Sequence, residues 1–110
     1  MKYKIFEGGT IKEILNRMLK EGYIPCNSET AYNYRKKNNL TRWFDTRTLF
    51  IKGKFRDATL SELKNIEKTY EKGGRLVCLD YYIGGFIGYD YFNGGGCFLG
   101  VKVNKLEKKR

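Results

Sequence analysis

Residues 3–22 read YKIFEGGTIKEILNRMLKEG, and this stretch joins a strand signal directly to a helix signal. Alternating side chains predict a first strand over residues 2–6, which ends at a glycine pair. Thr10 and Glu13 form a capping box, in which each side chain accepts a hydrogen bond from the other residue's backbone N–H. Apolar residues then recur at helical spacing up to the next glycine, so we predict a helix over residues 11–21.

Two further helices are predicted. Asn27 or Ser28 caps a helix over residues 29–37, whose acidic first turn and basic last turn suit the helix dipole. Thr59 opens a second capping box, and the apolar stripe behind it predicts a helix that ends at the glycines at residues 73–74.

The other segments favour strands. Residues 41–56 are rich in aromatic and β-branched residues, and residues 48–51 are the core of this strand. Lys52 and Gly53 form either a tight turn or the middle of one longer strand. Three strands are predicted near the C-terminus, with glycine-rich turns at residues 84–85 and 93–96, and they span residues 75–83, 86–92 and 97–103.

Together these elements predict one α+β domain over residues 1–104, followed by a frayed basic tail over residues 105–110. We expect an antiparallel sheet of about five strands that ends in a C-terminal β-meander, with two to three helices packed on one face. A hydrophobic content of 41% and an aromatic content of 15% are far too high for a disordered chain.

The charge of the chain is strongly positive, because 22 Lys and Arg against 12 Asp and Glu give +10. Such an excess suits binding to the phosphates of DNA or RNA. The candidate phosphate-binding residues are Arg35, Lys36, Lys37, Arg42, Arg47, Lys52, Lys54 and Arg56. If residues 50–56 form one continuous strand, the last three of these share a face. Alternatively, the lysines keep the protein soluble and block strand addition at a sheet edge.

Aromatic side chains in the last third of the chain suggest a stacking surface for bases. Tyr89, Tyr91 and Phe98 are the candidates, since glycines beside them allow a base to approach. The alternative is that these rings pack beneath the helices as part of the core.

Enzymatic chemistry is disfavoured, and we predict no catalytic residue, no metal site and no cofactor. The chain has no histidine, and its three cysteines form no C-x-x-C pair. With a two-residue turn at residues 84–85, Asp80 and Asp90 lie on opposite faces of the sheet, which does not suit an acid–base pair, whereas a three-residue turn would bring them to one face. The connection between the first two helices is longer than the turn of a helix-turn-helix motif, and the basic end of the second helix is the one feature that keeps this alternative open.

The absence of a long apolar run predicts no contact with a membrane, and the lack of a secretory signal predicts a cytoplasmic protein. The function that fits best is a non-enzymatic accessory that binds the nucleic-acid backbone. The alternative is a protein–protein interaction module, or a homodimer that pairs through the sheet, in which the charge serves solubility.

Overall fold

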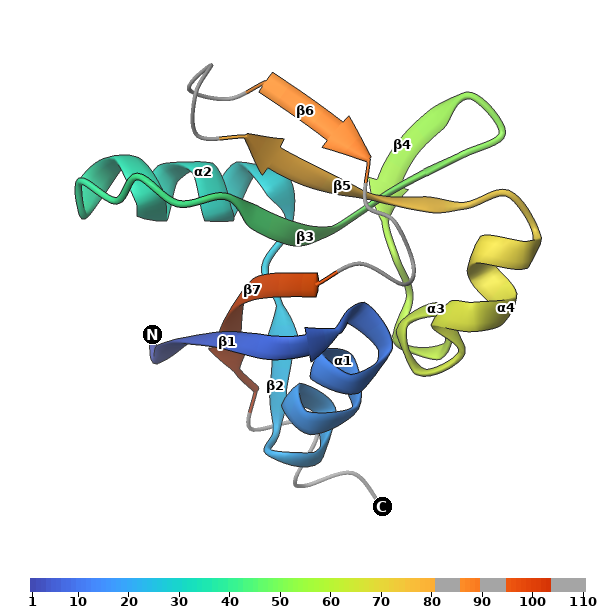
Figure 1. Cartoon of the computed structure of the whole chain (residues 1–110), viewed down its shortest axis with the longest axis horizontal. Coiled ribbons are helices and arrows are strands. Elements are labelled where there is room, and N and C mark those ends of the chain that lie inside the picture. Colours follow the sequence, from blue (N-terminus) through green and yellow to red (C-terminus); the bar gives the residue numbers. More distant parts are fainter. Residues whose placement is uncertain (81–85, 90–94, 104–110) are drawn as a thin grey trace.

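The computed structural model describes residues 1–80, 86–89 and 95–103. Within these residues, four helices accompany a seven-stranded sheet (Figure 1). The strands are β1 (Tyr3–Thr10), β2 (Tyr23–Pro25), β3 (Phe44–Ile51), β4 (Lys54–Asp57), β5 (Arg75–Asp80), β6 (Phe86–Tyr89) and β7 (Gly95–Lys102). The helices are α1 (Ile11–Lys20), α2 (Ser28–Lys37), α3 (Leu60–Lys64) and α4 (Ile66–Glu71). The predicted α+β class is confirmed.

The sheet is mixed, whereas the sequence predicted an antiparallel one. Its strand order is β1-β7-β3-β5-β6, with β2 paired to β7 and β4 paired to β3. The parallel pair is β3 with β7, where Asp45 lies beside Phe98, and the other pairs of the described strands are antiparallel. Two more strands are present than expected, because residues 23–25 and 54–57 each form a short strand of their own.

The predicted three-strand meander is wrong in its last step. β5 and β6 do pair as antiparallel neighbours, but β7 lies between β1 and β3 instead of beside β6. The burial of β7 explains this position. Three successive residues, Cys97, Phe98 and Leu99, are buried, so both faces of the strand are covered. A strand buried on both faces is typical of the interior of a sheet, with a neighbouring strand on each side.

Asp80 pairs with Phe86, whereas a two-residue turn at residues 84–85 would have set it opposite Tyr89. Of the predicted turn at residues 93–96, Gly95 and Gly96 begin β7 instead, and residues 84–85 and 93–94 lie outside the described residues.

Helices cover both faces of the sheet, so the prediction of helices on one face is wrong. One apolar cluster contains Phe98 together with the buried residues of α1, α3 and α4. A second cluster contains Cys97 and Leu99 together with Ala31 of α2. Because neighbouring residues of a strand point to opposite faces, α2 lies across the sheet from the other three helices.

Both predicted capping boxes are present. The Thr10 hydroxyl accepts a hydrogen bond from the backbone N–H of Glu13 at 3.2 Å, and the Glu13 carboxylate accepts one from the N–H of Thr10 at 2.9 Å. Thr59 and Glu62 make the same pair of bonds at 3.1 and 2.8 Å. These local bonds start α1 and α3 at the predicted residues.

Candidate functional site

A two-residue turn separates β3 from β4. Lys52 and Gly53 have φ angles of 54° and 76°, the left-handed conformation that such hairpin turns require and that glycine adopts without strain. Ile51 therefore pairs directly with Lys54. The alternative of one continuous strand through Gly53 is wrong. Lys54 and Arg56 share one face of β4, whereas Lys52 lies in the turn.

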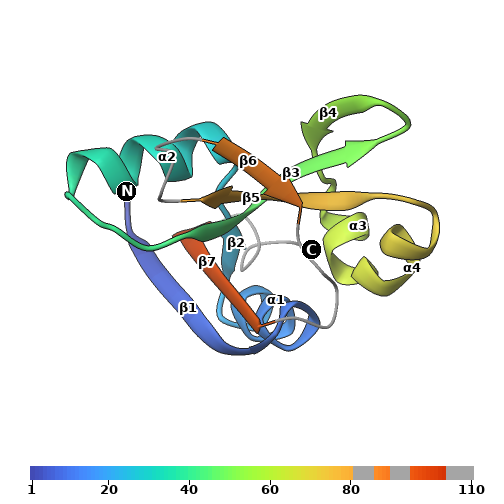
Figure 2. The same cartoon turned by 45° about the horizontal axis from the view of Figure 1, so that its top comes forward.

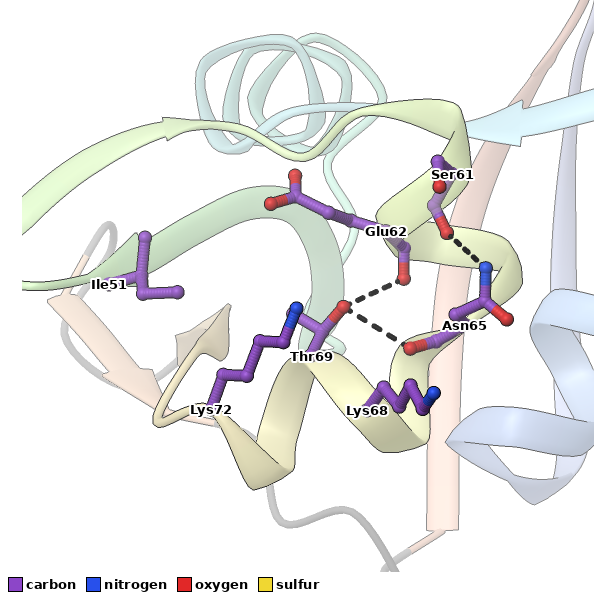
Figure 3. A pocket seen from close by; sticks show the side chains of 7 residues that line it. All are labelled: Ile51, Ser61, Glu62, Asn65, Lys68, Thr69 and Lys72. Carbon is purple, nitrogen blue, oxygen red and sulfur yellow. Dashed lines mark hydrogen bonds between the residues drawn. The ribbon is translucent and has the colours of Figure 1, made fainter.

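Two hollows share Ile51 in their lining, one on the hairpin itself and one between the end of β3 and helices α3 and α4. The first has a volume of about 310 Å³ and is lined by Ile51, Lys52, Lys54, Phe55 and Arg56. The second has a volume of about 260 Å³ and is lined by Ile51, Ser61, Glu62, Asn65, Lys68, Thr69 and Lys72 (Figure 3). We call the two together the hairpin–helix groove.

The helical wall of this groove depends on a break at Asn65. The sequence predicted one helix after Thr59, but Asn65 has φ −117° and ψ 48° and divides it into α3 and α4. Its side-chain amide donates to the carbonyl of Ser61 at 3.0 Å, and the Thr69 hydroxyl lies 3.1 Å from the carbonyl of Glu62 (Figure 3). The Ser61 carbonyl also accepts the backbone N–H of Asn65 at 3.0 Å, so the asparagine side chain adds a second bond to it, while the Thr69 hydroxyl bonds a carbonyl of the last turn of α3.

Lys68 and Lys72 are four residues apart in the sequence. They therefore lie on the same side of α4 and its C-terminal cap. Lys72 is the capping residue, and both lysines are exposed. They stand on successive turns beside the groove (Figure 3).

Glu62 is the one carboxylate among the described residues that line the groove, and its charge is already compensated. Its two oxygens accept hydrogen bonds from Arg56 at 2.7 Å each. These hydrogen bonds, opposed by partial desolvation and supported by the backbone of Thr59, lower the pKa of Glu62 to about 2. The same contact raises the pKa of Arg56.

Four lysines around the groove have no such partner. The ion pairs of the described residues are Lys4–Glu21, Lys12–Glu67, Arg42–Glu7 and Arg56–Glu62. None of these pairs includes the four lysines in question, which are Lys52, Lys54, Lys68 and Lys72. The groove therefore carries four lysines whose formal positive charges are not offset by an ion pair of the described residues.

Phe55 adds an apolar surface to the hairpin. It pairs across the strands with Phe50, and their ring centroids are 4.7 Å apart with the planes tilted by 49°. Its side chain is nevertheless 53% exposed.

The predicted basic residues do not form one surface. Lys36 and Lys37 are exposed at the C-terminal end of α2, which lies at the opposite end of the long axis from the β3–β4 turn in both views (Figures 1 and 2). Of the eight candidates, Lys52, Lys54 and Arg56 line the groove.

The three remaining arginines are held by bonds within the protein. Arg35 is only 4% exposed, and it donates to the carbonyls of Arg42 at 3.3 Å and Leu79 at 3.5 Å. Arg42 itself pairs with Glu7. Arg47 donates from Nε to the carbonyl of Ala58 at 2.6 Å, which ties β3 to the start of α3. These contacts give the three side chains structural roles.

The predicted stacking surface loses Phe98, which has no exposed surface and packs in the core beside α1. A base therefore has no access to its ring. The backbone of Tyr89 belongs to β6, but its side chain lies outside the described part of the structure, as do Tyr91 and the tail over residues 105–110.

The metal-ligating and thiol side chains were also located. In residues 1–80, 86–89 and 95–103, no group of three or more His, Cys, Asp or Glu side chains is placed so that it could hold a metal ion. Burial raises the pKa of Cys26 to about 12 and that of Cys97 to about 11, which keeps both thiols protonated and poorly nucleophilic. Asp45 is buried and accepts a hydrogen bond from the backbone N–H of Cys97 at 2.7 Å.

No protein-family model, curated protein or solved structure matches the chain. In the described part of the chain, no helix is both long and apolar enough to span a membrane.

Proposed function

We propose that this protein is a cytoplasmic, non-enzymatic accessory that binds nucleic acid, with the phosphate backbone in the hairpin–helix groove. The observation that carries the proposal is the set of four lysines around the groove that have no acidic partner among the described residues. Two of them come from the hairpin and two from the end of α4, so they border the groove on both sides.

Phosphate is the partner that suits these lysines best. Lysine ammonium groups bind phosphates as point charges, and an extended row of them can follow a polyanion. The negative charge of Glu62 does not oppose phosphate binding, because Arg56 donates two hydrogen bonds of 2.7 Å to its carboxylate. Partly enclosed walls also strengthen the field that the lysines produce.

Pairing of two copies through the sheet is less well supported. β1 has β7 as its one partner among the described strands, but a register irregularity lies between Glu7 and Thr10, where Gly8 and Gly9 have positive φ. Bulges of this kind interrupt an edge strand and prevent it from pairing regularly with another chain. β4 is only four residues long, and all four are exposed, including Lys54. Both features discourage strand addition.

The proposal is tested by fluorescence anisotropy with labelled DNA and RNA, single-stranded and duplex, over a range of KCl concentrations. The test variant replaces Lys52, Lys54, Lys68 and Lys72 with glutamine. A matched control removes the same charge from exposed lysines outside the groove, namely Lys2, Lys20, Lys36 and Lys37.

We expect wild-type binding that weakens with salt. If each groove lysine neutralises one phosphate, the test variant flattens the slope of log K against log salt by up to about 2.8 on single strands and about 3.6 on duplex DNA. The control flattens it far less. Equal losses in both variants, or no binding by the wild-type protein at low salt, would contradict the proposal.

A further inference from the structure

A further hollow lies away from the hairpin–helix groove, between α2 and the start of β1. Its volume is about 510 Å³, within the range of pockets that bind small molecules. Figure 2 shows the N-terminal end of the chain beside α2. The side chains of these two elements that line the hollow include those of Tyr3, Thr30, Asn33, Tyr34, Lys37 and Asn38.

Two tyrosine rings form one wall of this hollow. The ring centroids of Tyr3 and Tyr34 are 5.1 Å apart with the planes tilted by 54°, and both rings pack against the buried cluster that contains Leu99. This packing holds the rings in place before a ligand arrives, so little conformational entropy is lost when a flat ligand contacts them. Within the described part of the chain, neither hydroxyl has a hydrogen-bond partner.

Helix α2 supplies polar groups along the same hollow. Thr30, Asn33 and Lys37 are spaced by three and four residues, so they follow one side of the helix. The side-chain N–H of Asn38 donates to the carbonyl of Tyr34 at 2.9 Å, which leaves the side-chain oxygen of Asn38 as an acceptor. The amide of Asn33 has no partner among the described residues and offers both donors and an acceptor.

The charge of this hollow is positive. None of the described residues that line it is acidic, and Lys37 belongs to none of the ion pairs of the described residues. The C-terminal end of a helix carries a partial negative charge of about one half, which Lys36 and Lys37 in the last turn of α2 outweigh. The hollow therefore suits a ligand that has one anionic group.

We infer that this hollow binds a free adenine nucleotide, with the base against the tyrosine rings and the phosphate at Lys37. Bases stack on aromatic side chains, and an asparagine amide recognises adenine because it donates to N7 and accepts from the N6 amino group. Asn33 supplies that amide, and a lysine binds phosphate as a point charge. The inference goes beyond the proposed function and does not depend on it, because it concerns a different ligand in a different part of the molecule.

The test titrates isotope-labelled protein with AMP, UMP and inorganic phosphate and follows the amide chemical shifts by nuclear magnetic resonance. We expect AMP to perturb the amides at residues 2–4 and 30–38 at lower concentrations than those at residues 51–56. UMP has the same ribose and phosphate without adenine, so it should bind more weakly at these positions. Inorganic phosphate has no base to contact the rings and should bind most weakly.

Two variants and a matched control assign the contacts. Lys37→Gln removes a charge from the hollow, whereas Lys36→Gln removes one from the same helical turn outside it. Lys37→Gln should weaken AMP binding roughly tenfold, the lower end of the effect of a hydrogen bond to a charged group, and leave adenosine binding unchanged. Lys36→Gln should change neither.

The second variant, Asn33→Ala, tests recognition of the base. It should reduce the preference for AMP over UMP roughly five- to 150-fold, which is the discrimination that a bidentate contact with adenine provides. Asn33, Lys36 and Lys37 are exposed, so all three variants should fold like the wild-type protein, and denaturant unfolding checks this.

The outcomes separate this inference from the proposed function. Equal binding of AMP and UMP, equal shifts with inorganic phosphate, or equal losses in Lys37→Gln and Lys36→Gln would each overturn the adenine nucleotide site. So would the absence of AMP-dependent shifts at residues 30–38. Shifts confined to residues 51–72 would place AMP in the hairpin–helix groove, which overturns this inference and supports phosphate binding there. If oligonucleotides fail to bind while AMP perturbs α2 as expected, the proposed function fails and this inference stands.

Discussion

Replacement of Glu62 by glutamine should change stability and nucleic-acid binding in opposite directions. Glu62 accepts two hydrogen bonds from Arg56 at 2.7 Å and one from the backbone N–H of Thr59 at 2.8 Å. A glutamine side chain still offers an oxygen to Thr59, so the capping contact survives. The substitution removes the negative charge and releases Arg56 into the groove.

The loss of stability should be small. A negative charge in the first turn of a helix contributes about 0.3–1 kcal/mol, and the exposed contact with Arg56 adds little because water screens it. The pKa of Glu62 is lowered from 4.5 to about 2, so the charged form contributes stability at pH values above about 4.5. The contribution is lost as the pH falls through about 2. The difference between wild type and Glu62→Gln in urea unfolding should therefore be constant from pH 5 to 8 and shrink in acid.

Binding should strengthen at the same time, because the positive charge of the groove rises by one. If Arg56 gains a phosphate contact, the salt slope steepens by about 0.7 on single strands and about 0.9 on duplex DNA. Anisotropy titrations at several KCl concentrations measure both quantities. A folded Glu62→Gln variant whose affinity is unchanged or reduced would refute the reasoning, because the groove would then not face the phosphates.

Three further substitutions test the account of the fold. Thr10→Ala removes the hydroxyl that caps α1 and should lower the free energy of unfolding by about 1 kcal/mol, and an unchanged denaturant midpoint would argue against the cap. Asp45→Ala leaves the buried N–H of Cys97 without its acceptor and should cost about 1–3 kcal/mol, measured by thermal unfolding, unless the bond is dispensable. Gly53→Ala forces a side chain into the left-handed turn and should lower stability by about 1–2 kcal/mol while weakening binding; intact stability would mean that the turn tolerates a side chain.

Local signals in the sequence predicted helix starts well and helix continuity poorly. Thr10 and Thr59 cap helices because each needs only a glutamate three residues later. The break at Asn65 depends on hydrogen bonds that Asn65 and Thr69 make to nearby carbonyls, and these compete with the helix in a way that the apolar periodicity does not reveal.

The largest error of the prediction from sequence was the pairing of the strands within the sheet. Neighbours along the chain usually pair, which favoured a meander, but β7 is apolar on both faces and takes a central position instead. The same long-range packing places α2 on the opposite face, and this buries Arg35, a residue that its exposed neighbours had suggested was on the surface.

The candidate site was only partly visible in the sequence. Lys52, Lys54 and Arg56 were predicted as phosphate-binding residues of one continuous strand; that strand does not form, and the three residues line a hollow on the hairpin. The sequence did not reveal that Phe55 pairs with Phe50, because this pairing follows from the turn at residues 52–53, one of two alternatives left open. The spacing of four residues between Lys68 and Lys72 indicates that they lie on one side of a helix. That this side lies near the end of β3 follows only from the folded structure.

The most direct test of the groove is a map of amide chemical shifts by nuclear magnetic resonance during titration with oligo(dT) at low salt. The account predicts that the perturbed amides cluster at residues 51–56 and 61–72, on the two walls of the groove. The amides at residues 33–38, at the far end of α2, should stay unchanged although Lys36 and Lys37 are equally basic. Perturbations centred on α2, or spread evenly over every lysine-bearing surface, would contradict the central claim.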